Sequence, residues 1–292
     1  MCDEITEQEN QSFFQQQGRM SRRQFGSLAA GLGVAMMLPP VANAATVTET
    51  DVEIKTPDGM ADCYFVHPAS GKHPAVLVWP DILGLRPAFR MMGKRLAESG
   101  YAVLVVNPFY RNAKSPVVAE GASFSDPDIR NKVMPMARAL NAQTHFTDAK
   151  AFIGWLDQQG AVDTGKKVGT TGYCMGGPMV MRTAAAVPDR VGGAATFHGG
   201  GLVSDSEDSP HLLIPKMKAS FLIAVAANDD EREPEAKNIL RDTFAKNGLT
   251  AEIEVYEGAM HGWCPPDSRV YNEAQAEKAW GRLLVLFEKA LT

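Results

Sequence analysis

The sequence has little cysteine. Its 292 residues include four cysteines, Cys2, Cys63, Cys174 and Cys264, and no two of them form a C-x-x-C pair. Four cysteines are too few for a disulfide scaffold, and the missing pair excludes the common zinc and thioredoxin-type motifs. No metal site is expected, so each cysteine has to be interpreted from its own neighbours. The sequence leaves open whether Cys63 and Cys264 pair in an oxidising compartment.

An excess of positive charge and long hydrophobic runs are also missing. The formal net charge is −5, from 29 Lys and Arg against 34 Asp and Glu. No basic stripe interleaved with aromatic residues occurs, so a nucleic-acid partner is not expected. No apolar run reaches the roughly 20 residues that span a bilayer, so a stable membrane anchor is not expected either. The remaining composition is that of an ordinary globular protein.

The first 44 residues differ from the rest of the chain. Residues 1–18 are polar and rich in Gln and Glu, so they are expected to be disordered, or to lie upstream of a true start at Met20. The paired Arg22 and Arg23 precede a short apolar run and a small-residue triplet that ends at Ala44. This pattern is typical of a twin-arginine export signal cleaved near Ala44. It predicts the twin-arginine export machinery as a partner and a periplasmic mature protein.

From residue 45 onward, short apolar runs alternate with amphipathic stretches. The runs predict strands at 74–79, 101–106, 167–171, 193–197, 220–226 and 251–256, after a hairpin within 52–66. The stretches between them predict helices at 88–99, 145–158, 178–187, 234–247 and 272–291. This alternation indicates an α/β fold, with a mostly parallel sheet and helices on both faces.

One segment does not follow the alternation. Residues 112–141 contain Pro, Ser and Asp and one short helical stretch at 131–140, so we expect an excursion over the carboxyl ends of the strands. Long loops in compact domains often serve as lids or pocket walls. No linker, repeat or low-complexity tract divides the sequence after residue 44. Residues 45–292 are therefore expected to form a single domain.

A sharp junction between a strand and a helix is predicted around Cys174. The sequence there is Gly172-Tyr173-Cys174-Met175-Gly176. This G-x-nucleophile-x-G pattern forms a turn that presents its central side chain at the edge of the sheet. The amide of Met175 would point toward a developing oxyanion, and the helix N-terminus would lower the pKa of the thiol. The alternative is an inert buried cysteine among glycines needed for packing.

An acid and a base are expected further along the chain, in that order. Asp229 follows one predicted strand and His261 follows the next, so both belong to the sheet edge where Cys174 is expected. Asp230 is the alternative acid, since counting back from the turn residue Pro234 favours it. The sequence thus predicts a nucleophile, an acid and a base, with Asp230 as the alternative to Asp229 for the acid.

A second histidine also ends a predicted strand. His198 follows the strand at 193–197, but it precedes both candidate acids, which is the wrong chain order for the base of this architecture. It is therefore interpreted as a pocket wall, or as a structural histidine whose ring nitrogens have partners. The other histidines lie in ordinary loop or helix contexts.

Taken together, these motifs resemble those of the dienelactone hydrolases, which are carboxymethylenebutenolidase-like α/β-hydrolases. The resemblance runs from about residue 52 to the end of the chain. It rests on the turn around Cys174, the Asp229 region, His261-Gly262-Trp263 and the segment Trp79-Pro80-Asp81-Ile82-Leu83-Gly84-Leu85. It implies an α/β-hydrolase fold and a Cys–His–Asp triad that opens a cyclic enol ester.

The resemblance also implies roles for three more residues. Ile82 would supply a second amide of the oxyanion hole. Asp81 would place a carboxylate near the thiol, at a position where the family has the longer glutamate. Arg111 would hold a carboxylate of the substrate. The family has a second such arginine just after the histidine, and this sequence has no arginine there before Arg269.

The expected function is hydrolysis of a lactone or carboxylic ester. Cys174 would attack the carbonyl, His261 would transfer protons, and a thioester would be hydrolysed without a metal or organic cofactor. A general carboxylesterase of the same fold is the first alternative. The second is a non-catalytic redox or binding protein in which Cys174 is a sensor thiol, because exposed thiols of low pKa oxidise readily.

Overall fold

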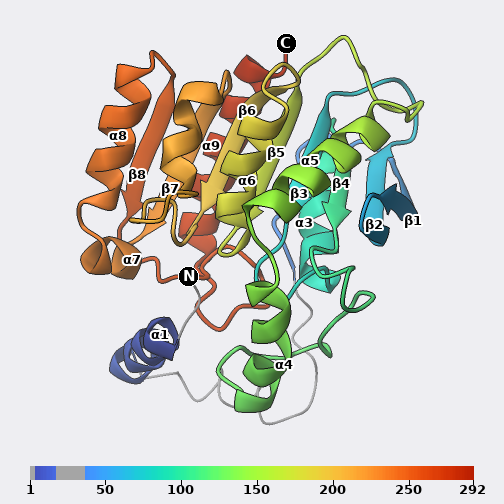
Figure 1. The fold of residues 1–292 in the computed structure, drawn as a ribbon. Coiled ribbons are helices and arrows are strands. Elements are labelled where there is room, and N and C mark those ends of the chain that lie inside the picture. The colour runs from blue at the N-terminus through green and yellow to red at the C-terminus, as the bar shows by residue number, and fades with distance from the viewer. Residues whose placement is uncertain (1–3, 18–36) are drawn as a thin grey trace.

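The computed structural model describes residues 4–17 and 37–292 (Figure 1). Arg22 and Arg23 of the predicted export signal, and most of the apolar run after them, lie outside the described residues. Within the described ranges, no helix combines the length and the apolarity that crossing a bilayer requires. The chain folds around one eight-stranded sheet.

The sheet is mostly parallel. Its strands lie in the order β1-β2-β4-β3-β5-β6-β7-β8. β1 and β2 form an antiparallel hairpin, and β2 also pairs antiparallel with β4. The six strands β4, β3, β5, β6, β7 and β8 run parallel to one another. The strands are Val47–Thr56 (β1), Gly59–Pro68 (β2), Ala75–Trp79 (β3), Ala102–Val106 (β4), Val168–Tyr173 (β5), Val191–Phe197 (β6), Ser220–Ala226 (β7) and Ala251–Tyr256 (β8). The predicted α/β architecture is confirmed.

Helices cover both faces of this sheet (Figure 1). Phe152 and Val180, from α5 and α6, belong to the hydrophobic cluster on one face, whereas Phe89 and Phe287, from α3 and α9, belong to the cluster on the other. The central strands between the two clusters are buried throughout, as expected of parallel strands covered on both sides. The helices are α3 (Pro87–Glu98), α5 (Ala142–Leu156), α6 (Gly176–Ala186), α7 (Ala227–Arg232), α8 (Ala236–Lys246) and α9 (Glu273–Ala290), with a 3-10 helix at Pro210–Lys216.

The excursion after β4 contains a helix that begins earlier than predicted. This helix, α4, spans Pro127–Arg138, because Asp126 caps it with its side chain and Pro127 suits the first helical position. Phe124 and Val133 of the excursion pack with Ile82 in a third hydrophobic cluster. The excursion is thereby held against the segment that follows β3.

The N-terminal stretch that composition predicted to be disordered contains a helix. Residues Glu4–Gln17 form α1, which lies near α7 in Figure 1. Its stabilising contacts are polar and reach distant parts of the chain: Asn10, for example, donates a hydrogen bond of 3.1 Å to the carbonyl of His261. Composition predicted disorder because a polar segment has little apolar surface to bury, and composition does not reveal such long-range polar partners.

Candidate active site

Cys174 occupies the turn between β5 and α6. Its backbone has a φ of 52°, in the left-handed region that non-glycine residues seldom adopt, and its amide donates a hydrogen bond of 3.1 Å to the carbonyl of Phe197 on β6. Strained conformations of this kind cluster at functional sites. Here the turn places the thiol at the carboxyl end of the sheet, directly before the first turn of α6.

The turn is possible because Gly176 packs against backbone. A β-carbon at Gly176 would lie 2.3 Å from the carbonyl oxygen of Trp79 at the end of β3, far inside van der Waals contact. The start of α6 therefore touches the segment that leads to Ile82. Within the described residues, neither the Ile82 amide nor the Met175 amide donates a hydrogen bond to another protein group. Both amides remain available to an oxygen atom bound at the site.

His261 and Asp229 meet beside this turn. The Nδ1 atom of His261 lies 2.7 Å from Oδ2 of Asp229, and both side chains are largely buried. The backbone of His261 is fixed as well, because its amide donates a hydrogen bond of 2.8 Å to Oδ1 of Asn228. Asp230, the alternative acid, points elsewhere and accepts hydrogen bonds of 2.5 and 2.7 Å from Lys237. Asp229 lies in the first turn of the short helix α7, where a loop was expected.

The charges around His261 favour its protonated form. Burial on its own lowers the pKa of His261, but the carboxylate of Asp229 and the sulfur of Cys174, which also hydrogen-bonds to the ring, outweigh burial and raise this pKa to about 10. Burial raises the pKa of Asp229, and the imidazolium reverses that effect, so the net pKa is lowered. The arrangement therefore favours an imidazolium at His261 between the carboxylate of Asp229 and the sulfur of Cys174.

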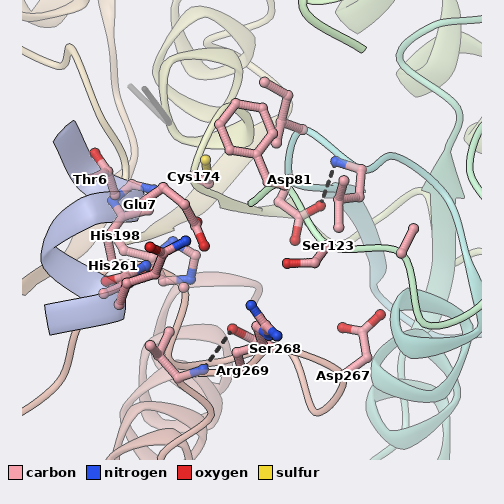
Figure 2. Close-up of a pocket in the computed structure, with 18 of the residues that line it drawn as sticks. Thr6, Glu7, Asp81, Ser123, Cys174, His198, His261, Asp267, Ser268 and Arg269 are labelled. Atoms are coloured by element: carbon pink, nitrogen blue, oxygen red, sulfur yellow. Dashed lines mark hydrogen bonds between the residues drawn. The ribbon is translucent and has the colours of Figure 1, made fainter. Parts of the chain in front are cut away.

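These groups lie at one side of a cavity of about 200 Å³ (Figure 2). The segment after β3 contributes Ile82, the excursion contributes Ser123 and Phe124, and the loop after His261 contributes Arg269. α1 contributes the remaining wall, including Glu7. The site thus gathers residues from both ends of the chain, although the turn and the triad candidates come from the middle and the C-terminal third.

Asp81 is held by an arginine that the sequence analysis did not single out. Arg86 donates hydrogen bonds of 2.6 and 2.9 Å to the two carboxylate oxygens of Asp81, and others of 2.6 and 2.9 Å to Asp267. Burial raises the pKa of Asp81 in spite of the opposing charge of Arg86. Both oxygens of Asp81 are therefore engaged by Arg86. The guanidinium in turn joins the segment after β3 to the loop after His261.

The structure does not bring Arg111 to the cavity. Its guanidinium donates hydrogen bonds of 2.8 and 2.7 Å to the buried Asp148 and of 2.6 and 3.1 Å to Asp58, and it stacks over the ring of Tyr110. A buried carboxylate needs a compensating cation, which is why Arg111 turns toward Asp148. Arg269 is the exposed arginine on the cavity wall, and it donates a hydrogen bond of 3.0 Å to Ser125. The spacing from the histidine had not indicated it.

His198 lines the cavity next to His261. The centroids of the two rings are 5.1 Å apart, and burial lowers the pKa of His198 to about 3, so its ring is neutral. Among the described residues, neither ring nitrogen of His198 has a hydrogen-bond partner. Of the two interpretations, the pocket wall agrees with the structure, and the histidine with satisfied nitrogens does not.

The two other described cysteines are buried, separate thiols. Cys63 belongs to the hydrophobic cluster on one face of the sheet and Cys264 to the cluster on the other, so they are not paired in a disulfide. Burial raises the pKa of each thiol. In the part of the chain that the structure describes, no group of three or more His, Cys, Asp or Glu is arranged to hold a metal ion.

The topology and the three positions define the class of protein. A mostly parallel sheet, with a strained nucleophile-type turn after β5, an acid after β7 and a histidine after β8, is the α/β-hydrolase arrangement. The sequence pattern of the dienelactone hydrolase family matches residues 61–291. The chain belongs to the dienelactone hydrolase family and is a hydrolase.

Individual relatives agree with this assignment. The chain is 26% identical over 280 residues to a Methylorubrum extorquens protein provisionally named carboxymethylenebutenolidase, covering 91% of this chain and 92% of the relative. It is 24% identical over 237 residues to the carboxymethylenebutenolidase of Rhodococcus opacus, covering 78% and 86% of the two chains. A solved Klebsiella pneumoniae structure, provisionally named dienelactone hydrolase, superposes with a TM-score of 0.72 at 21% identity, covering 84% of this chain and 99% of that one. The structural likeness supports the fold.

Two neighbouring carboxylates provide a direct test of the charge arrangement. We expect Asp229→Asn to lower the pKa of His261 from about 10 toward the ordinary value of about 6.5, because a neutral amide no longer stabilises the imidazolium. Asp230→Asn is the matched control and should leave this pKa unchanged, since Asp230 contacts Lys237 instead. NMR titration of the imidazole measures both values. A lowered pKa in the control alone would assign the acid to Asp230.

Proposed function

We propose that the protein hydrolyses a lactone or carboxylic ester, with Cys174 as nucleophile, His261 as general base and acid, and Asp229 as the group that orients His261. The observation that carries this proposal is the contact series at the strained turn. Nδ1 of His261 bonds to Asp229 at 2.7 Å, so its other ring nitrogen faces the sulfur of Cys174. An oriented base beside an activated nucleophile is the shared requirement of covalent acyl transfer.

The reaction would begin with attack of the Cys174 thiolate on the ester carbonyl. The carbonyl oxygen becomes an oxyanion, for which the unpaired amides of Ile82 and Met175 are the available donors at the start of α6. Collapse of this intermediate forms a thioester and expels the enolate or alkoxide. The imidazolium of His261 gives its proton to that leaving oxygen.

Hydrolysis of the thioester would complete the cycle. Neutral His261 removes a proton from water, and the resulting hydroxide attacks the thioester carbonyl. The second intermediate releases the acid and restores the thiolate beside the imidazolium. The first intermediate can expel either the thiolate or the oxygen leaving group, and a thiolate leaves readily. An enolate competes with the thiolate better than an alkoxide does. A cyclic enol ester therefore suits a cysteine nucleophile better than a simple alkyl ester.

The resting thiol in this proposal pairs with His261 and not with a carboxylate. Asp81 lines the same cavity as Cys174, whose sulfur acts on the pKa of Asp81, but both carboxylate oxygens of Asp81 accept hydrogen bonds from Arg86. The imidazolium of His261 is thus the cation that stabilises the thiolate, in addition to the N-terminus of α6.

We further propose that the substrate carries a carboxylate and that Arg269 binds it. Support comes from Glu7 in the cavity wall: burial raises the pKa of its carboxyl group, but the charge of Arg269 and a hydrogen bond to Ser125 act against that rise. A carboxylate therefore already finds a cationic environment there, close to His261. Arg86 is unsuited to this role, because two carboxylates already surround it.

The nucleophile assignment is tested by comparing two cysteines. We expect Cys174→Ala to lower kcat/KM for dienelactone and for p-nitrophenyl esters by a factor on the order of 10⁴, because covalent catalysis is lost. Cys63→Ala is the matched control, since Cys63 is buried on β2 away from the cavity. Retention of full activity in Cys174→Ala would refute the assignment. Complete alkylation of Cys174 in a protein inactive on every activated ester would instead favour the sensor thiol.

The carboxylate site is tested by comparing two arginines. We expect Arg269→Gln to raise KM for a carboxylate-bearing lactone about 10–100-fold, which corresponds to the loss of a charge-assisted hydrogen bond, with little change for a neutral ester. Arg111→Gln should leave both KM values within about twofold, but should lower the free energy of unfolding by about 3 kcal/mol because Asp148 loses its partner. Steady-state kinetics and urea denaturation separate the two effects. A raised KM for the carboxylate-bearing lactone in Arg111→Gln, with an unchanged KM in Arg269→Gln, would identify Arg111 as the residue that binds the substrate carboxylate.

We also propose that the protein is exported to the periplasm by the twin-arginine machinery and cleaved near Ala44. The paired arginines, the short apolar run and the small-residue triplet support this. Replacing Arg22 and Arg23 by lysine should retain the unprocessed chain in the cytoplasm, as fractionation and N-terminal sequencing would detect. Normal processing of that variant would count against this route.

A further inference from the structure

α1 precedes the predicted export signal, yet it forms part of the active-site wall. Of the side chains the structure describes in α1, Thr6 and Asn10 are buried, and Glu7, Glu9 and Phe13 are partly buried. Positions 6, 9 or 10, and 13 lie on one face of a helix. A helix whose inward face is mostly polar needs polar partners on the surface that it covers.

Those partners belong to the loop that carries His261 and to the helix α7, which carries Asp229. Asn10 donates a hydrogen bond of 3.1 Å to the carbonyl of His261. Glu9 accepts one of 2.9 Å from Asn228 and one of 2.5 Å from Arg232, two residues of α7. Asn228 is also the residue that bonds to the His261 amide, so α1 docks directly on the support of His261.

Glu7 extends from α1 into the cavity itself. Figure 2 shows its side chain reaching toward the space between Cys174 and Arg269. Burial raises the pKa of Glu7, and the charges of Arg269, Arg130 and His261, with a hydrogen bond to Ser125, act against that rise. The carboxylate thus lies in the cationic surroundings that we assigned to a substrate carboxylate. α1 and such a substrate would compete for the same space.

The hydrophobic core is complete without α1. Among the described residues, the three hydrophobic clusters draw their members from Leu38 to Leu291. The solved Klebsiella pneumoniae relative, 99% of which is covered by the alignment, corresponds to 84% of this chain. We therefore expect the sheet and its covering helices to stay folded when α1 is removed. Polar contacts at the edge of a site, without a shared apolar core, also allow reversible docking.

We propose that α1 is an intramolecular inhibitor that fills the active-site mouth with an acidic helix and is removed with the export signal. Water hydrolyses the peptide bond near Ala44 during processing, which separates residues 1–44 from the enzyme. The unprocessed chain is then held inactive, and the mature protein exposes the cavity to small esters. This inference rests on the hydrolase function and the cleavage site proposed above.

The test compares the full chain, the chain that begins at Ala45, and two double variants of the full chain. Glu9→Ala/Asn10→Ala, the docking variant, removes the hydrogen bonds of Glu9 to α7 and of Asn10 to the carbonyl of His261. Gln8→Ala/Ser12→Ala, the exposed-face variant, changes exposed positions of the same helix. Two rates are measured for each: kcat/KM on a carboxylate-bearing lactone, and alkylation of Cys174 by iodoacetamide, followed by mass spectrometry of its peptide. The second rate reports access to the thiol and needs no turnover.

We expect the processed chain and the docking variant to exceed the full chain in both rates by about tenfold or more. The exposed-face variant should match the full chain. A synthetic peptide of residues Glu4–Gln17 should inhibit the processed chain competitively, and a Glu7→Gln peptide should do so more weakly. These results would distinguish docking of α1 from a general loosening of the fold.

The failures are distinguishable. Equal rates of hydrolysis and alkylation in all four proteins would overturn the inhibitor role and leave the hydrolase function intact. If no protein hydrolyses the lactone, the proposed function is overturned. Faster alkylation in the processed chain and the docking variant would still support the covering of Cys174 by α1. Loss of both rates in the processed chain, with its circular dichroism unchanged, would show that α1 completes the site instead of blocking it.

Discussion

The geometry of this protein depends on the close contact between the first turn of α6 and the end of β3. Gly176 lies so near the carbonyl of Trp79 that no larger residue fits, and this approach accompanies the left-handed backbone of Cys174. The same contact brings the segment containing Ile82 beside Met175. Because two backbones touch, the thiol meets a helix N-terminus and two amides that have no hydrogen-bond acceptor among the described residues.

Charge is distributed unevenly around the cavity. Arg86 forms ion pairs with both Asp81 and Asp267, so its charge is neutralised by two carboxylates of the protein. His261 lies between Asp229 and Cys174 and gains a pKa of about 10. Arg269 is exposed on the cavity wall, donates a hydrogen bond to the hydroxyl of Ser125 and acts through its charge on the carboxylate of Glu7. The docking of acidic α1 follows from this imbalance, since its Glu7 and Glu9 meet cationic or donor groups on the mouth of the site.

Local sequence signals predicted much of the fold. The short runs predicted every strand from β3 to β8. The signal is clearest for β3 and β4, which are buried on both faces and apolar along their length. The early start of α4 could also have been read from Asp126 and Pro127, a side-chain cap followed by proline. In contrast, the helical state of α1 depends on partners such as Asn228, more than 200 residues away. No local pattern contains that information.

The sequence by itself determined the α/β class, the strained turn at Cys174 and the chain order of acid and base, because these depend on periodicity and on residue types at short spacings. Only the tertiary structure decided that Asp229 and not Asp230 meets His261, that Arg111 serves the buried Asp148, and that α1 lies across the cavity. Each of these choices is a competition between charged groups for the nearest buried partner. Such a competition is settled by distances in space, which spacing along the chain does not specify.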